Sequence, residues 1–344
     1  MKKKVLSLAI AAVMAPGFAA AADVSGFGDI NYTLTDDATA KDANGKSPTA
    51  GKFAANGEVD FSASPAGGVT FRADMDLALG SNGTIGANNG GANVSAATGG
   101  PSDSGVLEQA YLAWGVTEGV TVIGGVFNDP IGAEAEDVPD RTFMNHGVVY
   151  NILDQQTVLR GDNVAGLAVA GAVGPVTLTG AVLNDIGQTN EEHSMALLAN
   201  YSPIKGLDLE LGTVTQASQS KNAGSAENVT DFNVSYSPAQ VAGLTVGLDY
   251  LKAGKIVDSA REIFASYDFG HGLSAAARLE NVAWQSAFST AGDSKRTTFN
   301  VSYQVASNLK AVLESAKGDS ANPTSTVTGI MKDNVTTLNL VAKF

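Results

Sequence analysis

Hydrophobic and polar residues alternate along much of the chain. In VTFRADMDLAL, apolar residues fill every second position from Val69 to Leu79, and Arg72, Asp74 and Asp76 stand between them. Only a strand, whose successive side chains point to opposite faces, separates these residues into an apolar and a polar face. The segments DFNVSY, LSAAARLE, TFNVSYQV and TLNLVAKF repeat the pattern. We therefore predict an all-β chain whose strands are apolar on one face and hydrated on the other.

The links between these strands alternate in length. Short clusters of Gly, Pro, Ser and Asn, the kind that closes hairpins, are followed by long polar stretches such as 80–105 and 128–162. A soluble β-sandwich has no reason to place every long loop at one end. A transmembrane antiparallel β-barrel does, with short periplasmic turns and long external loops. The spacing predicts such a barrel with roughly 14 to 18 strands, and 16 is favoured.

Tyrosines mark one end of successive hairpins. Tyr201, Tyr236, Tyr267 and Tyr303 each stand at the end of an alternating run, close to a short turn. Amphipathic aromatic rings settle where a membrane meets water. The four tyrosines are therefore predicted to lie at the periplasmic interface of the barrel.

The N-terminal stretch is typical of an export signal. Three lysines are followed by an apolar run and a cluster of small residues, which predicts a signal peptide over 1–22, cleaved after Ala22. The apolar run is shorter than the roughly 20 residues that a membrane-spanning helix needs. The remaining residues, 23–344, are predicted to form the barrel, in the outer membrane of a Gram-negative bacterium.

Composition narrows the functional classes. The chain contains no Cys, so it can form neither disulfides nor thiolate metal sites. Its formal net charge is −14. Since binding to a phosphate backbone requires clustered Lys and Arg, no nucleic-acid partner is expected. The three histidines, His146, His193 and His271, are scattered in sequence and form no metal-ligand motif. We expect no enzyme activity, no metal and no cofactor.

The segment LEQAYLAWGVTEGVTVIGGVFNDP, 107–130, resembles the trimeric general porins of Gram-negative outer membranes. In that family the fourth and fifth strands carry an Ala-Tyr-x-Gly pattern, a tight turn and a Gly-Arg pair. This chain departs from the pattern at Ala113, where Gly is usual, and at Gly125-Val126, where an Arg commonly lines the constriction. The Pro-Glu-Phe-Gly-Gly motif of the third loop is also missing. The resemblance implies the fold more strongly than the pore chemistry.

The resemblance also covers the end of the chain and the assembly of the protein. Leu338, Leu340 and the terminal Phe344 occupy alternate positions, as in the C-terminal strand that the outer-membrane barrel assembly machinery recognises in this family. It further implies a homotrimer surrounded by outer-membrane lipid. The expected function is passive diffusion of small hydrophilic solutes and ions.

The long third loop, 128–162, supplies candidate pore residues. The resemblance implies that it folds into the lumen, whereas a surface loop with solvated charges remains the alternative. Acidic residues exceed basic ones at the inward positions of the strands, and fixed charges in a narrow aqueous path set ion preference. We therefore predict a cation-preferring channel; a substrate-specific channel or a structural or adhesive barrel is the alternative. The candidate pore-lining residues are Asp129, Glu134, Glu136, Asp137, Asp140, Arg72, Asp74, Asp76, Arg278 and Arg296.

Overall fold

The structure of the chain is a computed structural model. Residues 1–21, which include nearly all of the predicted signal peptide, lie outside the part that it describes, as does most of the 80–105 loop. The described residues are 22–36, 49–65, 67–79, 85–86, 107–154, 156–157, 162–186, 192–217, 227–286, 292–319 and 334–344.

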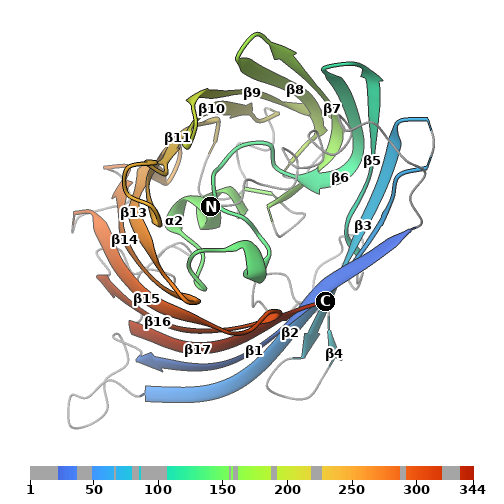
Figure 1. Cartoon of the computed structure of the whole chain (residues 1–344). Helices are drawn as coiled ribbons and strands as arrows, with labels where there is room; N and C mark the ends of the chain where they lie inside the picture. The colour runs from blue at the N-terminus through green and yellow to red at the C-terminus, as the bar shows by residue number, and fades with distance from the viewer. Residues whose placement is uncertain are drawn as a thin grey trace.

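The strands form one closed antiparallel barrel (Figure 1). Each long strand pairs with its neighbours in sequence, and the first strand, β1, pairs with both β2 and the last strand, β17, which closes the sheet. The short β4 pairs with the end of β3 and leaves β3 free to pair with β5, so sixteen long strands make the wall. The predicted sixteen-stranded barrel is confirmed. The strands are β1 (Asp23–Asp36), β2 (Thr49–Ala63), β3 (Val69–Leu79), β4 (Ile85–Gly86), β5 (Leu107–Thr117), β6 (Val120–Asn128), β7 (Asn163–Val173), β8 (Val176–Asn184), β9 (His193–Ile204), β10 (Leu207–Thr215), β11 (Val229–Tyr236), β12 (Leu244–Lys252), β13 (Val257–Gly270), β14 (Leu273–Trp284), β15 (Ser294–Ala306), β16 (Leu309–Asp319) and β17 (Asn334–Lys343).

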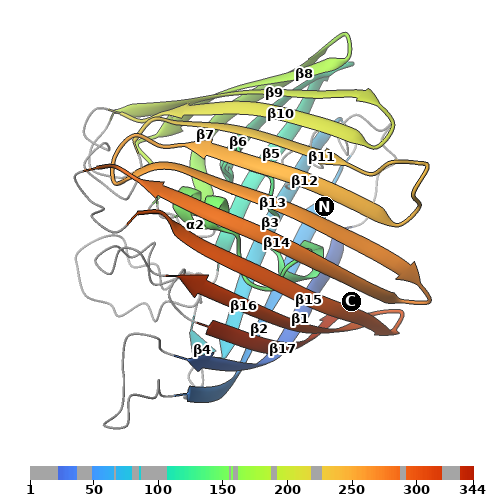
Figure 2. The same ribbon diagram turned by 90° about the vertical axis from the view of Figure 1, so that its left-hand side faces the viewer.

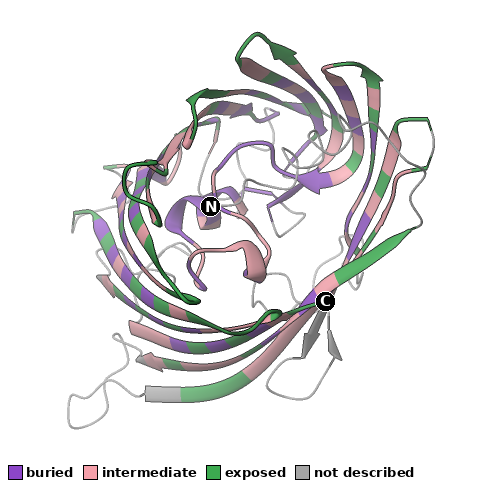
Figure 3. Ribbon diagram, viewed as in Figure 1, coloured by how far each residue is buried: buried purple, intermediate pink, exposed green. Residues whose placement is uncertain are grey.

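The alternation along each strand gives the barrel two different surfaces, one facing outward and one facing the lumen. In β9, Met195 and Leu197 are exposed on the outside, whereas Ala196 and Leu198 are buried toward the lumen. Figure 3 shows this alternation as stripes along the strands. The outer surface is therefore an apolar belt suited to lipid. Among the described residues, no helix has the length and apolar character needed to cross a bilayer.

The short turns gather at one end of the barrel, and the strand ends that the longer links join lie at the other (Figure 2). Tyr201, Tyr267 and Tyr303 are exposed near the short-turn end of their strands. His271, in the turn between β13 and β14, has a φ of 53° between two glycines that also have positive φ. A tight link of this kind favours glycine, since other residues rarely adopt this backbone conformation.

The third long link lies inside the barrel (Figure 1). It contains a 3₁₀ turn, η1 (Val138–Asp140), next to β17, and a short helix, α2 (Val148–Asp154), against β12, β13 and β14. Buried apolar side chains of the link, including Ile131, Val149 and Ile152, join wall residues in the main hydrophobic cluster. The main hydrophobic cluster therefore lies between the third loop and the wall strands from β5 to β14.

Candidate constriction site

The third loop divides the lumen into two chemically different sides. One side faces β13 to β16, and we call it the anchor side. It contains Arg278, Arg296, Glu262, Glu280 and Glu314 of the wall. The other faces β2, β3 and β5, and we call it the acidic side. It contains Glu58, Asp60, Arg72, Asp74, Asp76 and Glu108 of the wall with Glu136 and Asp137 of the loop.

Arg278 of β14 connects the wall to the loop on the anchor side. Its Nη1 lies 3.2 Å from Glu134 Oε2 of the loop and 3.8 Å from Glu262 Oε2, and its Nε lies 3.5 Å from Glu280 Oε2. Its guanidinium also stands over the ring of Phe143, 4.5 Å from the centroid. The side chain is almost fully buried, so its charge is neutralised by contacts rather than by water.

Carboxylates of the anchor side also accept hydrogen bonds from the loop backbone. Glu280 accepts one from Val148 N at 3.0 Å and Glu262 one from Val149 N at 2.7 Å, so both satisfy amides at the start of α2. Glu314 accepts two more, from the amides of Met144 and Asn145, each at 2.7 Å. The loop backbone is therefore held by the wall over several consecutive residues.

The backbone of Gly147 approaches the Glu262 carboxylate closely where α2 begins. A Cβ atom on Gly147 would overlap the carboxylate of Glu262. Gly147 N donates to Glu134 Oε2 at 2.8 Å, so this glycine fills the space between a loop carboxylate and a wall carboxylate. A larger residue would push the loop away from the wall.

Glu134 and His146 form a buried pair within the loop. The Nδ1 atom of His146 lies 2.9 Å from Glu134 Oε1, and its ring stacks on Tyr150 at 3.7 Å between centroids. Burial, followed by the charge of Arg141, lowers the pKa of His146 to about 4, so the neutral ring donates this hydrogen bond at neutral pH. Burial opposes ionisation of Glu134, but the hydrogen bond from His146 and the charge of Arg278 outweigh it and lower the pKa of Glu134 to about 2.

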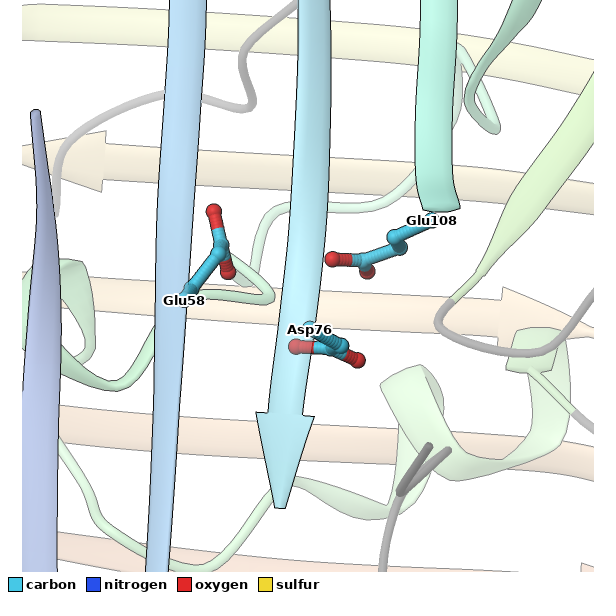
Figure 4. Close-up of side chains that lie close together, drawn as sticks. All are labelled: Glu58, Asp76 and Glu108. Atoms are coloured by element: carbon cyan, nitrogen blue, oxygen red, sulfur yellow. The ribbon is translucent and has the colours of Figure 1, made fainter. Parts of the chain in front are cut away.

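The acidic side brings three wall carboxylates together. Glu58 of β2, Asp76 of β3 and Glu108 of β5 lie close to one another (Figure 4), with one oxygen of each within 4.8 Å of the others. Glu58 also groups with Asp60 and Asp74 within the same limit. Carboxylate oxygens are the ligands that hard cations prefer. These groups therefore concentrate negative charge where a cation could approach.

Glu108 reaches this cluster because β5 is irregular. Asp74 of β3 pairs with Gln109 and Met75 pairs with Leu107, so Glu108 is the extra residue of a β-bulge. A bulge redirects a side chain that regular alternation would place on the other face. Strict alternation in the sequence therefore missed Glu108; its charge beside the apolar Leu107 was the signal that could have found it.

Two loop residues add to the acidic side. Burial raises the pKa of Glu136 well above its usual value, and the nearby charge of Glu108 raises it further. Glu136 Oε2 accepts a hydrogen bond of 2.8 Å from Asn128 Nδ2. Burial, followed by the charge of Glu108, raises the pKa of Asp137 to about 6. Burial is the larger cause of both shifts, and the neighbouring Glu108 adds to it in each case.

Arg72 is the basic partner on the acidic side. Its Nε lies 2.7 Å from Asp74 Oδ1, and its Nη2 lies 3.7 Å from Asp60 Oδ1. The arginine side chain is 23% exposed, whereas Asp74 is fully buried. One guanidinium therefore balances part of the acidic cluster, and its own charge is largely taken up by Asp74.

The structure separates the loop carboxylates that the sequence grouped. Glu136 and Asp137 face the acidic side, whereas Glu134 pairs with His146 and Arg278. Asp140 lies 2.9 Å from Lys343 Nζ of β17, and the buried Asp129 caps the loop start by accepting from Ile131 N at 3.2 Å. Arg296 makes a bidentate pair with Glu280, with both distances 2.6 Å.

Comparison with known proteins agrees with this architecture. Residues 22–344 match the model of a family described as putative β-barrel porin-2, OmpL-like. The chain belongs to this porin family. No curated protein matches the sequence significantly.

Solved porins share the fold of this OmpL-like porin. A mutant of the Rhodopseudomonas blastica porin is 15% identical, with a TM-score of 0.57 over 94% of this chain and 100% of that one. Salmonella typhi OmpF, in a complex with daunomycin, is 12% identical, with a TM-score of 0.59 over 94% and 97%. An anion-selective porin from Comamonas acidovorans is 11% identical, with a TM-score of 0.60 over 94% and 99%. The expected resemblance to general porins is thereby confirmed at the level of fold.

Proposed function

We propose that this porin is a passive diffusion channel for small hydrophilic solutes and ions in the outer membrane, and that it prefers cations. The observation that carries the preference is the acidic side of the lumen, where Glu58, Asp76 and Glu108 converge and Glu136 and Asp137 approach from the loop. The function requires no bond-breaking step and no cofactor.

Electrostatics supports a preference for cations. In a narrow aqueous path between low-dielectric walls, fixed carboxylates raise the local concentration of cations. The arginines of the anchor side offer little opposing charge to the path, because Arg278 and Arg296 are buried against Glu280. Screening weakens the effect as the Debye length falls from about 10 Å at 0.1 M salt to about 3 Å at 1 M.

Reversal potentials across a salt gradient in planar bilayers test the proposal. The unmodified channel should prefer cations, more strongly in dilute salt, and the double variant Asp76→Asn, Glu108→Gln should lose much of the preference. Glu118→Gln, in an exposed turn between β5 and β6, removes one carboxylate far from the cluster and should change little. Anion preference in the unmodified protein would refute the proposal, and the anion-selective Comamonas porin shows that this fold accommodates that sign.

Export and assembly complete the proposal. We propose that residues 1–22 are removed on export, that the assembly machinery reads Leu338, Leu340 and Phe344, and that the barrels form homotrimers in outer-membrane lipid. Phe344 N donates to Gly26 O at 3.1 Å, and the ring is exposed at the end of the closing strand. Deletion of Phe344 should lower the yield of heat-modifiable barrel in outer membranes; an unchanged yield would contradict the role of this residue. Crosslinking in membranes tests the trimer.

A further inference from the structure

The third loop leaves and re-enters the wall at two asparagines. Asn128 is the last residue of β6 and Asn163 is the first residue of β7, and the two stand opposite each other in the register. Just beyond them, Asp129 N donates to Asp162 O at 2.6 Å. The two ends of the loop are therefore held side by side.

These asparagines and Gln109 of β5 form a chain of amide side chains. Gln109 Nε2 donates to Asn128 Oδ1 at 3.4 Å, and Asn128 Nδ2 donates to Asn163 Oδ1 at 3.4 Å. The chain also reaches two carboxyl groups. Asn128 Nδ2 donates to Glu136 Oε2 of the loop at 2.8 Å, and Asn163 Nδ2 donates to an oxygen of Glu108 on the wall at 3.3 Å. The amide chain therefore connects the acidic flank of the loop with β5.

The two carboxyl groups need these donors. The side chains of Glu136 and Glu108 are hydrogen-bonding neighbours. Such a pair holds together only while it shares a proton, because two ionised carboxylates repel each other. The oxygens of a carboxyl group accept from an amide in either state. The amide chain can therefore hold the loop against the wall whether or not the pair keeps its proton.

Both asparagines are too deeply buried to meet a solute. Asn128 is 5% exposed and Asn163 is 1% exposed. Any effect that they have on permeation must therefore act through the loop and through the carboxyl groups to which they donate. On the acidic side the amide chain has the place that Arg278 has on the anchor side, where wall and loop are also joined through side chains.

We propose that Asn128 and Asn163 are positioning residues of the channel, which hold Glu136 of the third loop near Glu108 of the wall and thereby set the width of the passage on the acidic side. The inference rests on the proposed channel function, but it does not depend on the preference for cations.

Single-channel conductance of the purified full barrel at about 1 M salt tests the proposal, because screening there limits the contribution of electrostatics. Asn128→Leu and Glu136→Ala should each raise the conductance. Levels of higher conductance should become about tenfold more frequent, since the loss of one buried hydrogen bond shifts an equilibrium by about that factor. The combined variant should behave as either single one does, because both changes remove the same contact. Glu136→Gln keeps an oxygen that accepts from Asn128 and should keep the unmodified conductance.

The double variant Asn200→Leu, Asn233→Leu is the matched control. Asn200 Nδ2 and Asn233 Nδ2 donate to Glu210 at 2.6 Å and 3.1 Å. The change therefore also removes amide donors from a glutamate, but the contacts lie between the wall strands β9, β10 and β11. Its conductance should stay that of the unmodified barrel.

Heat modifiability on gels establishes that each variant is folded. If Asn128→Leu does not fold, Asn163→Leu replaces it in a cycle with Glu108→Ala, with a smaller rise in conductance because the bond from Asn128 to Glu136 remains. Unchanged conductance in the folded variants, or effects of the two single changes that add, would overturn the proposal. A barrel that opens no channel would overturn the proposed function as well. A channel without cation preference that shows the non-additive rise would refute only the proposed selectivity.

Discussion

Glutamates on the two sides of the third loop have opposite surroundings. On the anchor side, Glu280 and Glu314 each meet backbone amides, and Glu280 also meets two arginines. On the acidic side, Glu58 and Glu108 meet other carboxylates. A buried carboxylate stabilises a fold when donors surround it and opposes folding when like charges surround it. The anchor side therefore holds the loop in place, and the acidic side supplies unbalanced charge to the passage.

The largest loss of stability should come from removing Arg278, the central arginine of the anchor side. Arg278→Met leaves Glu134, Glu262 and Glu280 with less compensating charge in a buried site, which typically costs about 3–5 kcal/mol. Denaturant unfolding of the barrel in lipid vesicles measures this free energy. Lys205→Met, at an exposed turn, should stay within about 0.5 kcal/mol of the unmodified protein. A loss below about 1 kcal/mol for Arg278→Met would mean that the loop is held by its backbone contacts alone.

Adding a methyl group at the start of α2, also on the anchor side, should destabilise the barrel less than the loss of Arg278. Gly147→Ala forces the loop away from Glu262 and should destabilise the barrel by about 1–3 kcal/mol, as overpacking does. It should also change single-channel conductance, since the loop would move within the lumen. Gly28→Ala is the matched control, because nothing lies within 4 Å of its added methyl group. Equal effects of the two changes would show that the contact at residue 147 does not position the loop.

Neutralising a carboxyl group on the acidic side should stabilise the barrel, in contrast to the two changes on the anchor side. Glu136→Gln replaces a carboxyl group whose raised pKa shows that its ionised form is disfavoured, so the barrel should gain about 0.5–1 kcal/mol at pH 7. The amide retains a carbonyl oxygen that accepts from Asn128. The same denaturation assay applies. If the variant were destabilised, Glu136 would be a structural residue rather than a source of strain.

The smallest effect should be a dependence of selectivity on pH. The pKa of Asp137 is raised to about 6, so this group is mostly ionised at pH 7 and mostly protonated at pH 5. Acidification through this range removes negative charge from the passage and should weaken cation preference. Glu134, with a pKa of about 2, keeps its charge throughout. Reversal potentials of the unmodified protein and of Asp137→Asn should converge at pH 5; a difference that persists there would contradict this assignment.

Strand alternation predicted the wall better than the loop. It placed Arg72, Asp74, Asp76, Arg278 and Arg296 on the inward face because a regular strand sorts side chains by parity alone. These residues are inward in the structure. Parity could not place Glu108 correctly, because a bulge depends on how the neighbouring strand pairs.

The division of the loop carboxylates could not be predicted from the sequence. Glu134 and Glu136 are two positions apart, yet one contacts β14 and the other lies near β5. Which wall strand each meets depends on the path of the loop through the lumen, and that path depends on contacts between residues far apart in the chain. The loop partners of Glu314, for example, are 169 and 170 positions away from it.

The pairing of β1 with β17 has a consequence for how the molecule forms. The side-chain hydrogen bond from Asn339 to Asp29 joins residues 310 positions apart, at the seam where the sheet closes. Bringing such distant segments together is slow, because their contacts form only after the intervening chain is ordered. Until then, both seam strands expose unpaired backbone groups, which invite pairing with other chains. Closure of the seam is therefore expected to be the last and slowest step of folding, and the interval before it the period in which the chain is most prone to aggregate.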